Sequence, residues 1–262
     1  MEKLHIVKIG GNVVNDSDAL NDFLKKFRAI KGLKILVHGG GKLTTILAES
    51  LGVKQTIIDG RRVTDIETLN IAVMVYAGLV NKTVVAKLQA LHCNAAGYCG
   101  ADGNLILSRK RNTTPIDFGH VGDIVEDGID GSQFKQILKS GIVPVICSVT
   151  HDGNGNLLNT NADSIASKIA SELASHYLVS LIYCFEKKGV LMDIESDSSY
   201  LPTMSIDQYQ KLKNQNIITK GMIPKLDMAF DAFNHNVKHV SICHASDISI
   251  LENQITGTQL IK

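Results

Sequence analysis

The sequence lacks an excess of charge of either sign. Its 27 Lys and Arg residues are balanced by 26 Asp and Glu residues, which gives a formal net charge of +1. The composition therefore supports neither a broad basic surface for nucleic acid nor a basic face for a membrane. Any anion-binding site must be local, built from a few side chains and backbone groups.

Cysteine is scarce and follows no spacing pattern. The five cysteines are odd in number, contain no C-x-x-C pair, and in three cases lie in apolar runs: Cys93, Cys99, Cys147, Cys184 and Cys243. A disulfide framework or a cysteine metal site would need regular spacing. We interpret these residues as reduced thiols, most of them in the core, of a cytoplasmic protein.

Long apolar runs are absent as well. No run approaches the roughly 18 residues that a membrane-crossing helix needs. The first apolar stretch, Leu4–Ile9, is too short for a signal peptide and contains Lys8. The 262 residues show no internal repeat and suffice for one large domain or two lobes.

Lys8 lies near the end of a stretch typical of a buried strand, directly before Gly10 and Gly11. A lysine in such a strand is costly unless its ammonium is paired or reaches solvent. Reaching solvent at the sheet edge is one interpretation. We favour the other, a cation held beside a glycine turn at the carboxyl end of a strand, where parallel sheets bind ligands.

A second glycine turn, His38-Gly39-Gly40-Gly41-Lys42, joins an expected strand at residues 33–37 to a helix that continues to about Leu51. Glycines let the backbone approach a ligand with its N–H groups pointing outward, beside the positive end of a helix. Leu43 follows Lys42 where a Walker A loop needs Ser or Thr, and no G-x-G-x-x-G pattern is present. The turn therefore predicts an anion-binding backbone of another kind.

Two arginines follow an expected hairpin turn at Asp59-Gly60. Successive residues of a strand point to opposite faces. Arg61 can therefore face solvent while Arg62 reaches inward to bind a carboxylate with both edges of its guanidinium. Solvation of both arginines is the alternative. The apolar helix expected over residues 65–91 would be buried on more than one side, with an oligomer interface as a candidate partner for the second side.

Polar residues alternate in Asn159-Thr-Asn-Ala-Asp163, immediately before a helix whose apolar residues recur at helical spacing. One such residue suffices to cap a helix. Capping alone and ligand contact therefore both remain open for Asn159. Lys225, directly after Pro224, starts another helix, where a cation opposes the helix dipole unless an anion lies there.

The rest of the chain alternates between strand and helix patterns. Short strands and hairpins are expected between Cys93 and Val125. The other expected elements are helices at 127–139, 205–214 and from about Ser246, strands at 142–148, 177–184, 237–243 and 257–261, and a turn at 151–156.

Six motifs in register resemble the amino-acid kinase family, and most closely its acetylglutamate kinase branch. They are K-I-G-G at Lys8, H-G-G-G at His38, G-x-R-V-T ending at Thr64, G-H-V-G at Gly119, N-x-N-A-D at Asn159 and G-M-I-x-K ending at Lys225. The resemblance implies an α/β fold, a three-layer αβα sandwich with a mostly parallel open sheet of the carbamate-kinase type. Residues 1–175 would bind the acyl-amino acid and dimerise, and residues 176–262 would bind ATP, within a single kinase domain.

The resemblance also assigns roles to residues. Lys8 and Lys225 would flank the transferring phosphoryl group, and Asp163 would hold both. Substrate contacts would come from Gly40, Gly41, Arg62, Asn159 and Asn161. Nucleotide contacts would come from Gly10, Gly11, Glu186, Gly189, Leu191, Ile218, Thr219, Gly221 and Met222. No protein metal ligand is implied, because the phosphates of ATP would hold magnesium.

The implied activity is ATP-dependent phosphorylation of the γ-carboxylate of N-acetyl-L-glutamate, or of another N-acylglutamate such as the succinyl compound, in arginine biosynthesis. A carboxylate nucleophile has a pKa of about 4.3 and needs no general base. Positioning and electrostatic stabilisation would supply the catalysis, with N–H groups of Gly10, Gly11 and Gly40 assisting the lysines. The resemblance further implies a cytoplasmic homodimer joined at the 65–91 helix. Because the chain begins at its first strand, we expect no arginine-inhibited hexamer.

Three positions depart from the family pattern. The nucleotide loop reads Phe185-Glu-Lys-Lys-Gly189, so Glu186 would replace the usual acid while two lysines change the local charge. Lys220 stands where Gly or Asp is common. Arg61 replaces an apolar residue and could bind a second carboxylate, as in a succinyl substrate.

Two other functions remain to be separated from this one. The first is another kinase of the same fold, acting on aspartate, glutamate, carbamate or UMP. The second is a non-catalytic sensor of acyl-amino acids or nucleotides, which retention of the two lysines and Asp163 argues against.

Overall fold

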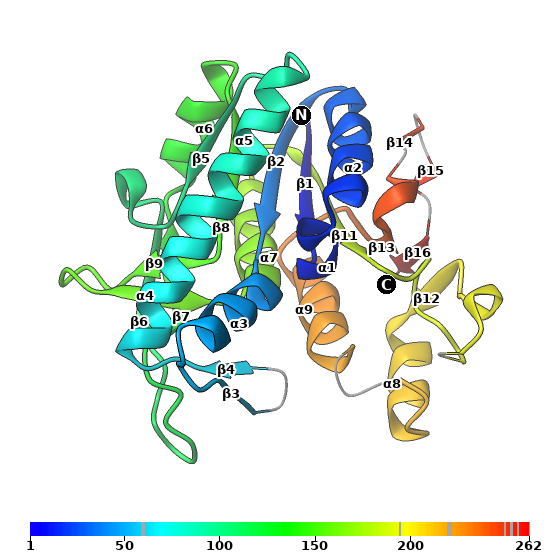
Figure 1. Ribbon diagram of the computed structural model, residues 1–262. Helices are drawn as coiled ribbons and strands as arrows, with labels where there is room; N and C mark the ends of the chain where they lie inside the picture. The colour runs from blue at the N-terminus through cyan, green and yellow to red at the C-terminus, as the bar shows by residue number, and fades with distance from the viewer. Residues whose placement is uncertain are drawn as a thin grey trace. The chain divides into compact units, whose positions relative to one another are not determined.

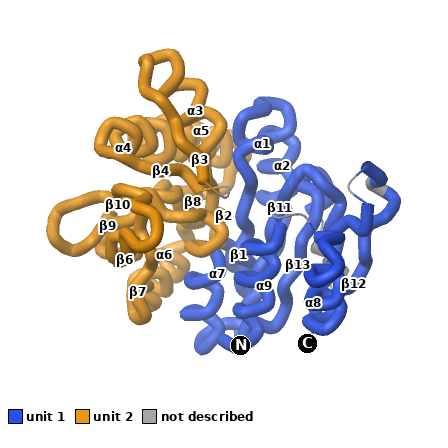
Figure 2. The backbone as a smooth tube through the Cα atoms, turned by 90° about the horizontal axis from the view of Figure 1, so that it is seen from below, with its two compact units in different colours: residues 1–34, 166–262 blue, residues 35–165 orange. Residues whose placement is uncertain are grey.

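The computed structural model describes residues 1–58, 61–193, 195–218, 222–248, 250–251, 254–255 and 257–261. The chain forms two compact units, unit 1 with residues 1–34 and 166–262 and unit 2 with residues 35–165 (Figure 2). Unit 1 therefore combines both ends of the chain, and unit 2 is the continuous stretch between them. The assignment of residues 1–175 to substrate and 176–262 to ATP concerns binding and stays a prediction.

Unit 1 contains a five-stranded arrangement in the order β12-β16-β13-β11-β1, with one antiparallel pair, β13 with β16. Strand β1 is parallel to β11, which sets Lys8 beside Tyr183 and Ile9 beside Cys184. The strands are β1 (Lys3–Ile9), β11 (Leu178–Phe185), β12 (Thr203–Ser205), β13 (His239–His244) and β16 (Thr258–Ile261), with a separate pair β14 (Ile250–Leu251) and β15 (Gln254–Ile255).

The helices of unit 1 are α1 (Gly11–Asn15), α2 (Ser17–Ala29), most of α7 (Ala162–Leu173), α8 (Ile206–Asn214) and α9 (Ile223–Asn234), with 3₁₀ turns η3 (Asp197–Ser199) and η4 (Ala245–Asp247). The expected helix from Ser246 is wrong, because only the turn η4 forms there. The His244 ring accepts a hydrogen bond from the Ser246 N–H, which satisfies a local turn, and the chain then enters β14.

Unit 2 contains three parallel strands in the order β2-β8-β5 (Figure 1). It also contains a closed barrel in the order β10-β7-β6-β9. The barrel is tightly packed, since a Cβ on Gly122 would lie 2.4 Å from the Thr160 Oγ1. The strands are β2 (Leu33–His38), β3 (Thr56–Ile58), β4 (Arg61–Val63), β5 (Ala95–Tyr98), β6 (Ile106–Lys110), β7 (Val121–Ile129), β8 (Val143–Cys147), β9 (Val149–His151) and β10 (Leu157–Thr160).

The helices of unit 2 are α3 (Gly41–Ser50), α4 (Ile66–Val73), the π-helical η1 (Met74–Val80), α5 (Asn81–Ala90) and α6 (Gly131–Lys139), with the 3₁₀ turn η2 (Asp102–Asn104). The helix expected over 127–139 begins later, at Gly131. Residues up to Ile129 belong to β7, and the Asp130 carboxylate caps α6 by accepting from the Ser132 and Gln133 N–H groups.

The predicted fold class is confirmed. Helices pack on strands in each unit, α9 on β13 in unit 1 and both α5 and α6 on β8 in unit 2. The neighbouring strands on which they pack are parallel in both units. The chain is therefore a mixed α/β protein with a mostly parallel sheet, as the sequence predicts.

The segments α4, η1 and α5 form one continuous helix, Ile66–Ala90, which by length and composition could cross a membrane. A search for uninterrupted apolar runs does not reveal this property. Its surroundings give another interpretation, because Ile71, Val75, Val84 and Leu88 are buried within the protein. We interpret it as the core helix of unit 2.

A polar network lies within the core of unit 2. The fully buried His38 ring places Nδ1 2.8 Å from the carbonyl oxygen of Gly39 and Nε2 3.0 Å from the Asn81 amide nitrogen. A carbonyl only accepts, so Nδ1 carries the proton and Nε2 accepts from Asn81. The same amide nitrogen donates to the Val145 carbonyl at 3.0 Å. The network holds a neutral histidine directly before the glycine turn.

This network predicts a pH dependence of stability. Burial lowers the pKa of His38 to about 4, against 6.5 in the unfolded chain. The unfolded chain therefore takes up the proton first, and stability is lost as the pH falls from 6.5 towards 4, by up to about 3 kcal/mol. We expect His38→Gln to reduce the pH dependence of the thermal midpoint in this window, and the part that remains to come from His5, whose pKa is also lowered to about 4 by burial.

The exposed His235 offers a matched control, because His235→Gln should leave the pH dependence unchanged. An unchanged slope in His38→Gln would show that the buried ring does not titrate in this way.

Candidate functional site

In unit 1, Lys8 and Lys225 approach the same aromatic ring. The Nζ atom of Lys8 lies 5.0 Å from the centroid of the Phe185 ring, and the Nζ atom of Lys225 lies 3.9 Å from it. The two ammonium groups are therefore at most 8.9 Å apart, the sum of these distances. Lys8 is only 6% exposed, so it does not reach solvent at an edge of the sheet.

Local structure explains how these lysines meet. Phe185 ends β11 one residue beyond Cys184, the partner of Ile9 in the parallel ladder. Helix α9 begins at Ile223 with Pro224 in its first turn, which places Lys225 at the positive end of the helix. Two cations and a helix N-terminus together create a local positive field that suits an anion.

Asp163, the third predicted catalytic residue, lies in the first turn of α7 and is 5% exposed. A buried carboxylate must be stabilised by cations, hydrogen-bond donors or a helix N-terminus. Asp163 lies at a helix N-terminus, which stabilises its negative charge. The predicted role of Asp163 in holding Lys8 and Lys225 stays a prediction.

In unit 2, Arg62 lies against the second glycine turn. Its Nη2 donates to the Gly41 carbonyl at 2.7 Å and to the Thr45 hydroxyl at 2.9 Å, and its Nη1 donates to the Gln55 side chain. A Cβ on Gly41 would lie 3.8 Å from Nη2, and one on Gly40 would lie 2.8 Å from the Tyr76 ring. The predicted substrate residues Gly40, Gly41 and Arg62 are thus brought together, with the guanidinium fixed in direction.

Arg61 and Arg62 point to different environments, as strand alternation requires. Arg61 is exposed, whereas Arg62 is half-buried at the glycine turn. The interpretation that both are solvated is therefore wrong for Arg62. The exposure of Arg61 gives no support to a second carboxylate-binding arginine in this site. The turn expected at Asp59-Gly60 lies outside the described residues.

Asn159 and Asn161 differ in their contacts. Asn161 caps α7, because its Oδ1 accepts from the Ser164 N–H at 3.0 Å. Asn159 instead donates from Nδ2 to the Thr64 hydroxyl at 3.0 Å, and that hydroxyl donates to the Arg62 carbonyl at 3.0 Å. Capping therefore explains Asn161 alone. Asn159 belongs to the cluster around Arg62, which agrees with its predicted substrate role without testing it.

The predicted nucleotide residues in unit 1 vary in their contacts. The Gly10 N–H donates to the Cys184 carbonyl at 3.2 Å, and its predicted contact to an anion stays a prediction. Gly189 packs against β16, where a Cβ would lie 2.4 Å from the Thr258 Oγ1. Glu186 is exposed, directly after Phe185.

The remaining residues predicted to bind the nucleotide lie near the first residues of α1 and α9 or in the loop after β11. Gly11 begins α1, Leu191 forms an isolated bridge with Tyr200, Ile218 is buried, and Met222 precedes α9. Thr219, Lys220 and Gly221 lie outside the described residues. The nucleotide roles of all these positions stay predictions.

Several residues of the two clusters are not predicted from the sequence. Thr64 could have been found, since it ends the G-x-R-V-T motif and is fully buried. Thr45 and Gln55 orient Arg62 from positions without a local signal. Phe185 is also unmarked, because its contacts to two lysines depend on residues remote along the chain.

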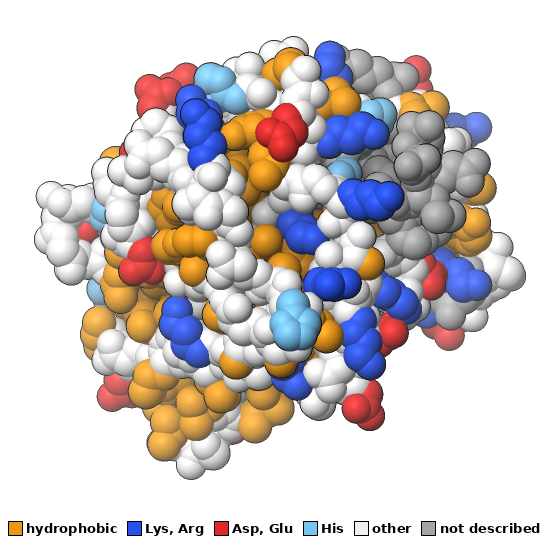
Figure 3. Space-filling model, turned by 90° about the horizontal axis from the view of Figure 1, so that it is seen from above, with side chains coloured by type: hydrophobic (Ala, Val, Ile, Leu, Met, Phe, Trp, Pro, Cys, Tyr) orange, Lys and Arg blue, Asp and Glu red, His pale blue; other side chains and the backbone are white. Residues whose placement is uncertain are grey.

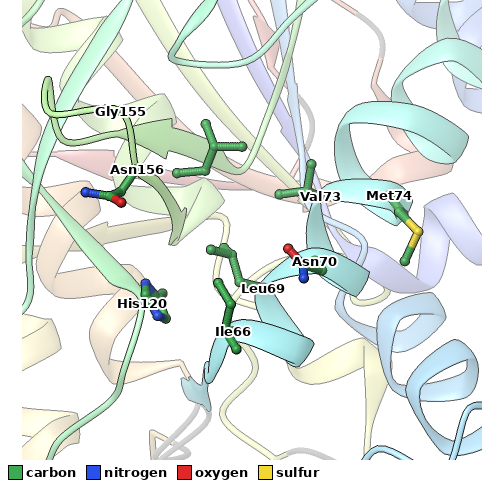
Figure 4. Close-up of a pocket in the computed structure, with 9 residues that line it drawn as sticks. Ile66, Leu69, Asn70, Val73, Met74, His120, Gly155 and Asn156 are labelled. Carbon is green, nitrogen blue, oxygen red and sulfur yellow. The ribbon is translucent and has the colours of Figure 1, made fainter.

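A groove of about 480 Å³ lies elsewhere in unit 2. It is lined by the helix residues Ile66, Leu69, Asn70, Val73 and Met74 and by His120, Gly155, Asn156 and Leu157 (Figure 4). No predicted catalytic or substrate residue lines it. We therefore take the lysine cluster of unit 1 and the arginine cluster of unit 2 as two candidate sites, each within its own unit, and treat this groove as a separate surface.

Among the residues that the structure describes, no group of three or more His, Cys, Asp and Glu side chains could hold a metal ion. The two clusters instead offer ammonium groups, a guanidinium and hydroxyls. This set of groups suits phosphate and carboxylate ligands.

Comparison with known proteins agrees with these chemical properties. The family model for the amino acid kinase family matches residues 3–244. The chain is 49% identical to acetylglutamate kinase of Cytophaga hutchinsonii, over 100% of this chain and 99% of that protein. It is 48% identical to acetylglutamate kinase of Parabacteroides distasonis, over 95% of this chain and 96% of that protein.

Solved structures share the fold. A structure from Streptococcus mutans UA159 matches with a TM-score of 0.80 at 26% identity, over 98% of both chains. Carbamate kinase from Giardia lamblia, bound to AMP-PNP, matches with a TM-score of 0.68 at 15% identity over 99% of this chain and 98% of that one, which bears on the fold alone. The chain belongs to the amino acid kinase family.

Proposed function

We propose that this chain transfers the γ-phosphoryl group of ATP to the γ-carboxylate of an N-acyl-L-glutamate, with N-acetyl-L-glutamate as the first candidate. The observation that carries the proposal is the approach of Lys8 and Lys225 to one ring in unit 1. The full-length similarity to acetylglutamate kinases supplies the substrate class. The product would be an acyl phosphate, as arginine biosynthesis requires of its second step.

In this reaction the carboxylate oxygen attacks the γ-phosphorus, the bond to the β,γ-bridging oxygen breaks, and ADP leaves. Negative charge spreads over the oxygens of the transferring group, and fixed cations stabilise it most strongly where water is excluded. Lys8 and Lys225 supply those cations, and Asp163 orients them. Magnesium accompanies ATP and is held by its phosphates.

The substrate end of the reaction falls to the Arg62 cluster. A guanidinium can bind a carboxylate in bidentate fashion, and Arg62 is fixed by Gly41, Thr45 and Gln55. We assign it the α-carboxylate of the acylglutamate. Asn159, linked through Thr64, contacts the amino-acid part of the same substrate, with the Gly40 and Gly41 backbone beside it.

A coupled assay of ATP consumption tests the proposal, run across N-acetyl-, N-succinyl- and free glutamate, aspartate, carbamate and UMP. We expect turnover with an N-acylglutamate and a fall in kcat of about 10²–10³-fold in Lys8→Ala and Lys225→Ala, because a transition-state cation is lost. Lys213→Ala is the control, since Lys213 pairs with Asp227 on the surface. Ligand binding without turnover in the unsubstituted protein would identify a sensor instead.

The arginine pair gives a second test. Arg62→Lys should raise KM for the acylglutamate by roughly tenfold or more, because the planar fork and its fixed direction are lost. Arg61→Lys, one residue away but exposed, should change KM less than twofold with either acyl group. A selective loss of N-succinylglutamate activity in Arg61→Lys would instead place Arg61 in the substrate site.

We also propose that the protein is a cytoplasmic homodimer joined through the continuous helix of unit 2. Ile66, Met74 and Leu79 on this helix are 55%, 52% and 59% exposed, an unusual density of large apolar side chains in water. Figure 3 shows a patch of hydrophobic side chains at the lower left edge of the face in view. A second copy offers a matching apolar surface, because a twofold interface uses the same patch on both subunits.

Sedimentation velocity tests the dimer. The unsubstituted chain should sediment as a dimer, and Met74→Glu combined with Leu79→Glu should sediment as a monomer, because buried unpaired charge is costly. Ile206→Glu on α8, 38% exposed, is the control and should leave the dimer intact. A monomeric or hexameric unsubstituted protein would refute the proposal.

A further inference from the structure

The reaction proposed above uses Lys8 and Lys225 but gives no role to the ring that both approach. We propose that Phe185 is a positioning residue, whose ring holds the two ammonium groups in place for the phosphoryl group. This inference rests on the proposed function. It concerns a side chain for which the sequence offers no motif.

The ring is itself firmly held. Phe185 is 5% exposed and ends a strand that is paired on both sides, with β1 and with β13. Its ring lies 6.3 Å from that of Tyr183 at an interplanar angle of 4°. Tyr183 is the residue opposite Lys8 in the parallel ladder. The ring and the Lys8 backbone are therefore fixed by the same pair of strands.

Both ammonium groups lie within the range of cation–π attraction. At 3.9 Å and 5.0 Å from the ring centroid, they are inside the roughly 6 Å at which a lysine interacts with an aromatic ring. The two ammonium groups, at most 8.9 Å apart, repel each other. A ring carries negative potential on its faces, so it offsets part of this repulsion without bringing a second anion.

The lack of net charge matters for catalysis. A carboxylate in the place of Phe185 would neutralise the lysines and compete with the phosphoryl oxygens for their N–H donors. An aromatic ring adds no negative charge of its own beside the lysines, and it offers no directional hydrogen bond that must be broken when the nucleotide arrives. The acidic neighbour, Glu186, is exposed rather than buried at this position.

The competing interpretation is that Phe185 only fills space between β1 and α9. The two interpretations differ in what they require of the side chain. A space-filling role depends on volume and apolar character, whereas a positioning role depends on the negative potential of the ring face. Fluorine substitution separates them, because it removes that potential stepwise with little change in volume.

The experiment replaces Phe185 with mono-, di- and trifluorinated phenylalanine in the full chain and measures steady-state kinetics with ATP and the N-acylglutamate that it turns over. We expect kcat to fall with each fluorine, by about tenfold across the series, in proportion to the lost cation–π energy. KM for the N-acylglutamate should change less than twofold, because we assign the carboxylate contact of this substrate to Arg62, which belongs to unit 2, whereas Phe185 belongs to unit 1. Phe185→Tyr, which keeps the ring, should retain most of kcat.

Phe134 provides the matched control. It is fully buried in α6 of unit 2, and its fluorinated series should leave kcat unchanged. The thermal midpoint should stay constant in both series. Equal kcat across the Phe185 series would overturn the positioning role and leave the proposed function standing. Absence of turnover in the unsubstituted chain would overturn the proposed function and this inference together.

Discussion

The repulsion between the ammonium groups of Lys8, which is buried, and Lys225, which is half-buried, is the constraint on which the rest of unit 1 depends. Lys8 and Lys225 are brought within 8.9 Å of each other by a strand and a helix that lie more than 200 residues apart in the sequence. Folding must work against that repulsion, which the Phe185 ring and buried anionic groups can reduce. Two cations held together at the end of parallel strands form a binding site for an anion. In phosphoryl transfer, two fixed cations stabilise the charge on the transferring group.

In unit 2, hydrogen bonds fix the direction of an arginine side chain that would otherwise be flexible. Arg62 is fixed through the Gly41 carbonyl, Thr45 and Gln55, and the neighbouring Thr64 hydroxyl links it to Asn159. The glycine turn beside it is supported from within by His38, whose neutral form is maintained by burial. The cluster therefore depends on hydrogen bonds whose geometry is set before any ligand binds, which lowers the entropic cost of binding. Each unit thus contributes a preorganised set of charges.

The sequence predicts those features that leave a local signal. Lys8 stands out as a cation inside an apolar strand, the glycine turn follows a strand and precedes a helix, and alternation separates Arg61 from Arg62. The sequence does not predict features that depend on residues remote along the chain, such as the contacts of Phe185 and the hydrogen bond between His38 and Asn81. Local hydrogen bonds also override helical sequence patterns. The Asp130 carboxylate caps α6, so this helix begins later than its pattern predicts, and the His244 ring stabilises a turn where the pattern predicts a helix.

The most direct test of the central claim is a crystal structure of the protein with magnesium ADP, tetrafluoroaluminate and N-acetyl-L-glutamate, in which the fluoride complex represents the transferring phosphoryl group. We predict that the Nζ atoms of Lys8 and Lys225 both lie within hydrogen-bond distance of the fluoride ligands and that the Arg62 guanidinium contacts the α-carboxylate. A complex in which neither ammonium group contacts the fluoride ligands would contradict it.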